Sequence, residues 1–109
     1  MPRARRQQGE PGDPALALFD VLGQRWALRV LWELRDDPLT YRAIANRIPG
    51  LSTSVLTTRL RELRAASLVE HEARSGYRLS PDGRSLLNQL TALAEWARQA
   101  NFTAPRRRS

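Results

Sequence analysis

The sequence predicts a mainly α-helical domain with a small β-hairpin, a winged helix-turn-helix of five helices. Two observations predict this fold class. Two short amphipathic stretches, 40–48 and 52–66, are separated by the turn Pro49-Gly50-Leu51. Two short β-prone stretches then flank the glycine-bearing tip Arg74-Ser75-Gly76. This order of elements is typical of proteins that place one helix in a DNA major groove, so double-stranded DNA is the expected partner.

The length of 109 residues fits one domain, close to the size at which oligomerisation often adds stability. We expect a mobile Arg-bearing lead over 1–13, the domain over 14–102 and a basic tail over 103–109. All 18 basic residues are Arg, and six lie in the two end segments: Arg3, Arg5, Arg6, Arg106, Arg107 and Arg108. The other 12 Arg and the 11 acids leave the middle of the chain near +1. A field that attracts DNA must therefore come from a local face or from the ends, which could equally be solubilising segments.

Several classes of function are excluded by residue types that the chain lacks. It has no Cys and a single His, which excludes a disulfide framework, a thiol redox sensor and an ordinary zinc site. No Ser/His/Asp set can be assembled around His71, and no glycine-rich phosphate loop occurs, so neither an enzyme nor a cofactor is expected. The chain shows no apolar run long enough to span a bilayer and no secretory signal. We therefore expect a cytoplasmic protein without a membrane partner.

The first helix is expected over 14–22, with Asp13 as its cap and a proline in its first turn. Only Asp20 is polar in this helix, so it should have a second packing partner, such as another subunit. The second helix is expected over 24–35 as a central, largely buried element. One side of that helix would carry Trp26, Val30 and Leu34.

The two helices of the expected helix-turn-helix have clear caps, Thr40 for residues 40–48 and Ser52 for residues 52–66. The second of them has an apolar stripe formed by Leu56, Leu60 and Leu63. Its opposite face and its exposed start carry Thr53, Ser54, Thr57, Thr58 and Arg61. Ser and Thr are poor helix formers in water, but small hydroxyl side chains suit close approach to base edges and phosphates.

The hairpin strands are expected over 68–71 and 77–79, and the last helix begins at Ser80-Pro81-Asp82 and ends near Phe102. One stripe of this helix is apolar: Leu86, Leu87, Leu90, Leu93, Ala94 and Ala97. A helix of about 20 residues is too long for so small a domain to cover. The overhang, with Trp96 beside the stripe, is expected to form a dimer surface; the alternative is that it closes the core of a monomer.

Over about residues 14–100 the chain resembles the HxlR-type winged-helix regulators of bacteria, within the MarR-like superfamily. The resemblance rests on six segments in the right order: Leu22-Gly23-Gln24-Arg25-Trp26, Ile48-Pro49-Gly50-Leu51-Ser52, the run from Val55 to Leu63, Leu68-Val69-Glu70, the run from Tyr77 to Leu86, and the closing Leu93-Ala94-Glu95-Trp96-Ala97. It implies a homodimeric DNA-binding regulator that dimerises through its first and last helices. It also implies that the segment from Ser52 enters the major groove, while the hairpin tip touches the neighbouring backbone or minor groove.

Three departures from the family pattern matter. Many members carry a Cys just before the first helix, where this chain has Gly12-Asp13-Pro14, so thiol sensing cannot operate here. Ser67 stands where a Gly is usual, which disfavours a left-handed turn after the helix over 52–66. The hairpin is shorter than usual, so Arg74 is expected to make most of its DNA contacts.

The expected DNA contacts lie on the start of the helix over 52–66, at two helix N-termini and on the hairpin. Base contacts are assigned to Ser54, Thr57 and Thr58, and contacts to bases or phosphates to Thr53 and Arg61. Phosphate contacts are expected from backbone amides or side chains of Thr40, Ser52, Arg42, Arg74 and Arg78. The alternative is an ordinary solvated helix face.

A second group of residues is assigned to a dimer interface or an effector pocket. It comprises Leu16, Phe19, Trp26, Trp32, Leu90, Leu93, Trp96 and Ala97. Its aromatic members either pack in the core or line a site between subunits for a small hydrophobic effector. The sequence thus predicts a transcription regulator, a homodimeric repressor that reads a pseudo-palindromic operator. The alternative is a winged-helix protein-interaction module without specific DNA binding, which the near-neutral middle of the chain keeps open.

Overall fold

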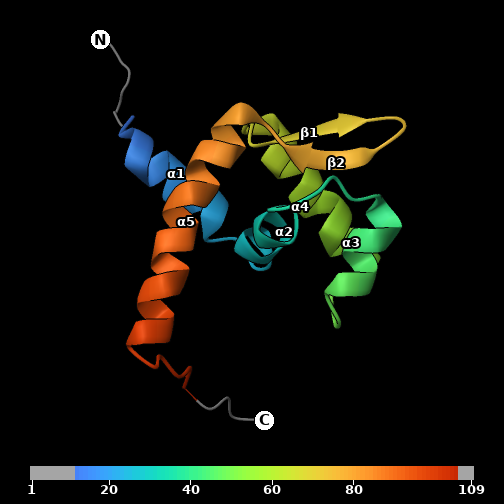
Figure 1. Ribbon diagram of the computed structural model, residues 1–109. Coiled ribbons are helices and arrows are strands. Elements are labelled where there is room, and N and C mark those ends of the chain that lie inside the picture. The colour runs from blue at the N-terminus through green and yellow to red at the C-terminus, as the bar shows by residue number, and fades with distance from the viewer. Residues whose placement is uncertain (1–11, 106–109) are drawn as a thin grey trace.

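The computed structural model describes residues 12–105, so the predictions about the Arg-bearing ends lie largely outside the described residues. The elements follow in the order α1 (Pro14–Leu22), α2 (Ala27–Glu33), α3 (Tyr41–Arg47), α4 (Thr53–Ala65), β1 (Val69–Glu72), β2 (Gly76–Leu79) and α5 (Pro81–Gln99). Figure 1 shows α1 and α5 on one side of the molecule, α3 and the hairpin tip on the other, and α2 and α4 between them. The predicted fold class, a winged helix-turn-helix, is confirmed.

The hydrophobic core lies around α2 and α4. Its fully buried side chains come from α2, α3, α4 and the residues just after them: Val30, Leu31, Leu34, Ile44, Ile48, Leu56, Leu60 and Leu63. The hairpin adds Val69 and Leu79, and α5 adds Leu87. The apolar stripe predicted for α4 is thus fully buried, which orients the opposite face of that helix outward.

The prediction for α2 was wrong in its bounds and in the place of Trp26. The helix has seven residues and begins at Ala27. Trp26 has a left-handed backbone with φ of 77°, because a turn in which the Ala27 amide donates to the Gln24 carbonyl (3.0 Å) separates α1 from α2. Trp26 therefore does not share a helical side with Val30; it is half-buried beside the core, and the Arg25 guanidinium lies 5.2 Å from its ring centroid.

Strand β1 begins one residue later than predicted, and strand β2 begins one residue earlier. Val69 pairs with Leu79 and Glu72 with Gly76, so Gly76 belongs to β2 and not to the tip. A short antiparallel bridge joins Leu39 to Tyr77 through two backbone hydrogen bonds of 2.9 and 2.8 Å. A Cβ at position 76 would overlap the Leu39 carbonyl, and φ is +93° there, so glycine is required where this bridge packs on β2.

The left-handed turn that Ser67 disfavours is nevertheless present, with φ of 62°. The Ser67 amide donates to the Arg64 carbonyl (2.9 Å) and the Leu68 amide to the Leu63 carbonyl (3.0 Å), the Schellman pattern of a helix C-terminus. The Ser67 carbonyl also accepts from the Ser80 hydroxyl (2.6 Å). These tertiary and capping hydrogen bonds hold the turn against the conformational cost of a non-glycine residue.

Replacing Ser67 by Gly is expected to stabilise the protein by about 0.5 to 1 kcal/mol, because it removes the left-handed strain and the Ser67 hydroxyl makes no hydrogen bond within residues 12–105. Thermal denaturation should show a rise in Tm of about 3 to 6 °C. Ser67→Ala keeps the left-handed strain and serves as the control. If Ser67→Gly were no more stable than this control, the backbone at position 67 would not be strained.

Helix α5 ends three residues earlier than predicted. Asn101 has φ of 51°, and the Phe102 amide donates to the Ala97 carbonyl (2.9 Å), so a second Schellman turn ends the helix. This turn brings the Phe102 ring beside the Trp96 ring, with 6.3 Å between the ring centroids. No residue of α1 is buried, and Leu93 and Trp96 of α5 are 58% and 57% exposed.

Within residues 12–105, no helix is long and apolar enough to cross a bilayer.

Candidate nucleic-acid interface

Helix α4 is held at a fixed angle to α3 by a short turn and two caps. The Thr40 hydroxyl accepts from the Ala43 amide (3.1 Å), and the Ser52 hydroxyl accepts from the Val55 amide (3.2 Å). Between the two helices Gly50 adopts φ of +87°, which turns the chain sharply. The caps and the turn predicted from the sequence are all present, and they leave the start of α4 exposed.

The hydroxyl groups of α4 differ in the hydrogen bonds that they already make within the protein. The Thr58 hydroxyl donates to the Ser54 carbonyl (3.0 Å), and Thr58 is half-buried. The Thr57 hydroxyl lies 3.1 Å from the Tyr41 hydroxyl. Ser54 and Thr53 are exposed, and Ser54 makes only a long contact of 3.4 Å with the Ser52 hydroxyl. Among residues 12–105, Ser54 and Thr53 therefore present the least engaged hydroxyls on this part of α4.

Tyr41 is a residue whose role the sequence did not reveal. Its hydroxyl donates to the Thr53 carbonyl of α4 (2.8 Å) and lies beside Thr57, so it joins the first turn of α3 to the first turn of α4. Helical periodicity puts Tyr41 on one apolar face with Ile44 and Ile48, which predicts only that it packs. No local signal distinguishes a tyrosine that makes this bond from one that only packs, because the partner is 12 residues away.

Charge is unevenly divided along the described chain. Residues 40–79 carry seven Arg against three acids, whereas residues 12–39 and 80–105 together carry five Arg against seven acids. The three acids of the first group are all paired, Glu62 with Arg59 and both Glu70 and Glu72 with Arg78. The positive charge therefore gathers on the helix-turn-helix and the hairpin, although the sum over the chain hides it.

Four arginines of this segment make no ion pair within residues 12–105: Arg42, Arg61, Arg64 and Arg74. All four are exposed. Arg74 lies in the turn between β1 and β2, as predicted for the tip of the hairpin. The Arg78 guanidinium instead lies 3.1 Å from a Glu70 oxygen and 3.0 Å from a Glu72 oxygen, so two carboxylates already offset its positive charge.

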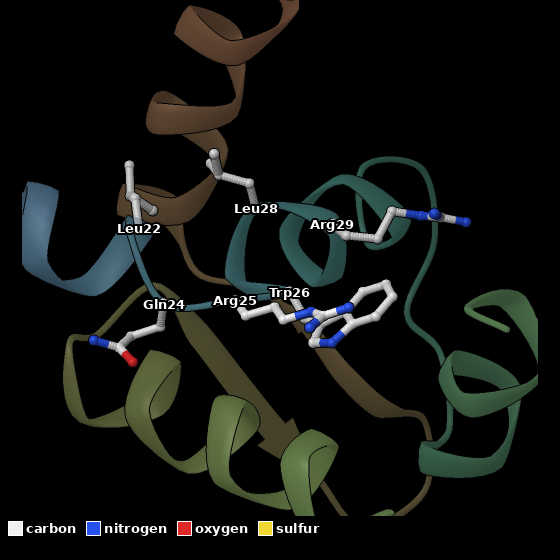
Figure 2. A pocket seen from close by; sticks show the side chains of 6 residues that line it. All are labelled: Leu22, Gln24, Arg25, Trp26, Leu28 and Arg29. Carbon is white, nitrogen blue, oxygen red and sulfur yellow. The ribbon is translucent and has the colours of Figure 1, made fainter. Parts of the chain in front are cut away.

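The residues assigned to a dimer interface or effector pocket do not form one site in a single subunit. Leu16 and Phe19 are exposed on α1, at 60% and 61%. A groove of about 330 Å³ between α2 and α5 is lined by Leu28, Arg29, Trp32, Leu90, Leu93, Ala94 and Ala97. Trp26 lines a second hollow, also of about 330 Å³, with Leu22, Gln24, Arg25, Leu28 and Arg29 (Figure 2). Figure 2 shows Arg25 beside Trp26 in this hollow.

The last side chains to consider are His71, the single histidine of the chain, and the acidic residues that could bind a metal ion. The His71 ring stacks on Tyr77 with 4.4 Å between ring centroids, a packing contact within the hairpin. Within residues 12–105, no group of three or more His, Asp or Glu side chains is placed to hold a metal ion.

A capped helix-turn-helix, an exposed hydroxyl face and a hairpin on a cationic segment define the winged helix-turn-helix class of DNA-binding transcription regulators. The HxlR-like helix-turn-helix family matches residues 21–104. The chain belongs to this family and is a transcriptional regulator of the HxlR type.

Similar proteins agree with this assignment. An HTH-type transcriptional regulator of Methanothermobacter thermautotrophicus is 35% identical over 83 residues, which cover 71% of this chain but 63% of that protein's length. YodB of Bacillus subtilis is 30% identical over 87 residues, covering 74% of this chain and 78% of YodB. The structure of quinone-bound YodB aligns with 81% of this chain and 99% of that chain, with a TM-score of 0.72. A possible HxlR family factor of Thermoplasma volcanium, 23% identical, shares the fold with a TM-score of 0.73, covering 84% of this chain and 88% of that one.

Proposed function

We propose that the chain is a cytoplasmic homodimeric repressor that reads a pseudo-palindromic operator. The observation that carries this proposal is the separation of two surfaces. Exposed hydroxyls lie on α4, and four of the arginines that make no ion pair within residues 12–105 lie on α3, α4 and the hairpin, whereas exposed large apolar side chains lie on α1 and α5. Two subunits joined through α1 and α5 would present two copies of α4 to half-sites about one helical turn apart, or a multiple of that distance. Base contacts from Ser54, Thr57 and Thr58, contacts to bases or phosphates from Thr53 and Arg61, and phosphate contacts from Arg42 and Arg74 belong to this proposal.

The test is binding of the purified protein to the DNA upstream of its own gene, with an unrelated fragment as competitor. We expect tight, competitor-resistant binding that falls steeply as salt rises from about 50 to about 200 mM, because released counterions drive the association. A fluorescence anisotropy titration at several salt concentrations measures both the affinity and the slope. Equal, weak binding to both fragments would favour the alternative, a protein-interaction module without specific DNA binding.

The proposed dimer predicts the effect of charging the apolar face of α5. Replacing Leu93 and Trp96 by Asp is expected to raise the dimer dissociation constant at least about 100-fold, because large apolar side chains dominate such interfaces. Sedimentation equilibrium measures it. Asn88→Asp with Gln99→Asp adds the same two charges to exposed polar positions of α5 and should leave the dimer intact. A dimer that survives the first pair of changes would contradict the proposed interface.

The proposal also includes release by a small hydrophobic effector. The groove between α2 and α5 has a volume of about 330 Å³ and an almost wholly apolar lining, at the low end of the range for ligand pockets. Because the chain has no cysteine, the effector would bind reversibly and without thiol chemistry. Such a ligand would contact Trp32 of α2 and Leu93 of α5, so it would act where the dimer surface begins.

A further inference from the structure

A third concave surface lies on the cationic side of the molecule, between α4 and the hairpin. This cleft of about 400 Å³ is lined by Tyr41, Thr57, Leu60, Arg61, Arg64 and Tyr77. Arg64 was not among the residues predicted to contact DNA, because it could equally have paired with Glu62. The structure pairs Glu62 with Arg59 and leaves Arg64 in the cleft.

The two arginines of the cleft have no anionic partner within residues 12–105. They are three residues apart on one edge of α4, where like charges are close enough to repel each other. None of the residues that line the cleft is acidic. A pair of unneutralised guanidinium groups beside a concave surface favours an anion with several oxygens, since each group can donate two parallel hydrogen bonds.

Two of the side chains that line the cleft are held by contacts of their own. Tyr41 is held by its hydrogen bond to the Thr53 carbonyl (2.8 Å). Tyr77 is held by its two backbone bonds to Leu39 and by stacking on His71. No hydrogen bond of its hydroxyl is seen within residues 12–105, so Tyr77, which lines the cleft with the two arginines, keeps a hydroxyl that can donate to a ligand.

We propose that this cleft binds a backbone phosphodiester of the operator, on the strand that separates the major groove from the next minor groove. This inference rests on the proposed function and deepens it. A protein with α4 in a major groove and its hairpin tip at the adjoining minor groove must have a sugar-phosphate backbone between the two elements. The cleft lies between those two elements, and Arg61 and Arg64 supply the charge that a phosphate requires.

The test measures DNA binding by three variants, Arg61→Gln, Arg64→Gln and the double variant, beside the wild-type protein. Each is titrated on the upstream DNA and on an unrelated fragment. The double change should weaken binding to both fragments by the same factor, on the order of tenfold or more, and reduce the slope of log K against log salt by about 1. Tyr77→Phe, which removes only the hydroxyl, should weaken both by a few-fold. Arg84→Gln with Arg98→Gln removes the same charge from α5, outside the cleft, and should leave the slope unchanged.

Each other result has a distinct meaning. If the wild-type protein binds no DNA specifically, the proposed function and this inference both fail. If it binds and the cleft variants keep the wild-type affinity and slope, or lose no more than the α5 control, the inference alone fails. A changed preference between fragments would assign Arg61 or Arg64 to base contact and overturn the phosphate assignment. Inorganic phosphate, titrated by calorimetry onto the protein without DNA, should release little heat; tight binding there would assign the cleft to a free anion.

Discussion

Replacing both Ser54 and Thr58 by Glu is expected to weaken binding to the operator by more than about 100-fold while the protein stays folded and dimeric. Both positions lie on the face of α4 opposite its buried stripe, where the proposed major-groove contacts are made. Two carboxylates there would face base edges and phosphates, and like charges brought together across an interface cost several kcal/mol. An acid in the first turn of a helix is favourable, so Ser54→Glu should not weaken the helix itself.

Fluorescence anisotropy on the upstream DNA measures this loss, with circular dichroism and light scattering on the same samples. Ser85→Glu with Asn88→Glu adds the same two charges to exposed positions of α5. It should cost at most a few-fold, since it changes only the distant field of the protein. Unchanged binding by the α4 variant, or equal losses for both variants, would remove α4 from its proposed role as the helix that reads DNA.

Replacing Gly83 by Ala is expected to destabilise the protein by about 3 kcal/mol and to lower Tm by about 15 °C. Gly83 is buried in the first turn of α5, and a Cβ there would overlap the Leu68 carbonyl oxygen. That carbonyl cannot move, because it accepts from the Ser80 amide (3.0 Å), and the Ser80 hydroxyl accepts from the Gly83 amide (2.9 Å). The whole start of α5 would have to shift away from the hairpin.

The sign of this change makes the test decisive. In an unobstructed helix, Gly→Ala stabilises by about 0.5 to 1 kcal/mol, so a clash must reverse the ordinary propensity. Asn88→Ala, at an exposed position of the same helix, is the control and should be neutral or slightly stabilising. Gly50→Ala separates the two costs, because a Cβ there meets nothing within 4 Å and only the left-handed backbone is penalised. Thermal and urea denaturation of the three variants measure the differences, and a Gly83→Ala variant as stable as wild type would contradict the close packing.

The parts of the fold that the sequence predicted well are those fixed by neighbouring residues. Thr40 and Ser52 cap the helices as expected, and Gly50 makes the turn between them. The parts that were wrong have no clear signal in the neighbouring residues. Trp26 adopts a left-handed backbone that its residue type disfavours, in the turn between α1 and α2. Gly76 pairs with Glu72 in β2, and it must be glycine because Leu39, far earlier in the sequence, packs against it.

The candidate site shows the same division. Periodicity alone brought Ser54, Thr58 and Arg61 to one face of α4. It could not show that Tyr41 bonds to α4, that Arg64 and Tyr77 share a cleft, or that Arg78 is held by two glutamates across the hairpin. A net charge near +1 for the middle of the chain also concealed a cationic segment, because composition sums over surfaces that folding separates.

The hydrogen bonds of Ser80 have a geometric consequence for any dimer joined through α5. They fix the start of this helix to the turn that ends α4, through the Ser67 and Leu68 carbonyls. Helix α5 has 19 residues and is about 28 Å long, so a tilt of about 5° at its far end, caused by a ligand or a partner, displaces the near end by about 2.5 Å. In the proposed dimer, the distance between the two copies of α4 would thus be set by the angle at which the two copies of α5 cross. A small rotation of α5 far from the DNA would then move both copies of α4 away from their major grooves.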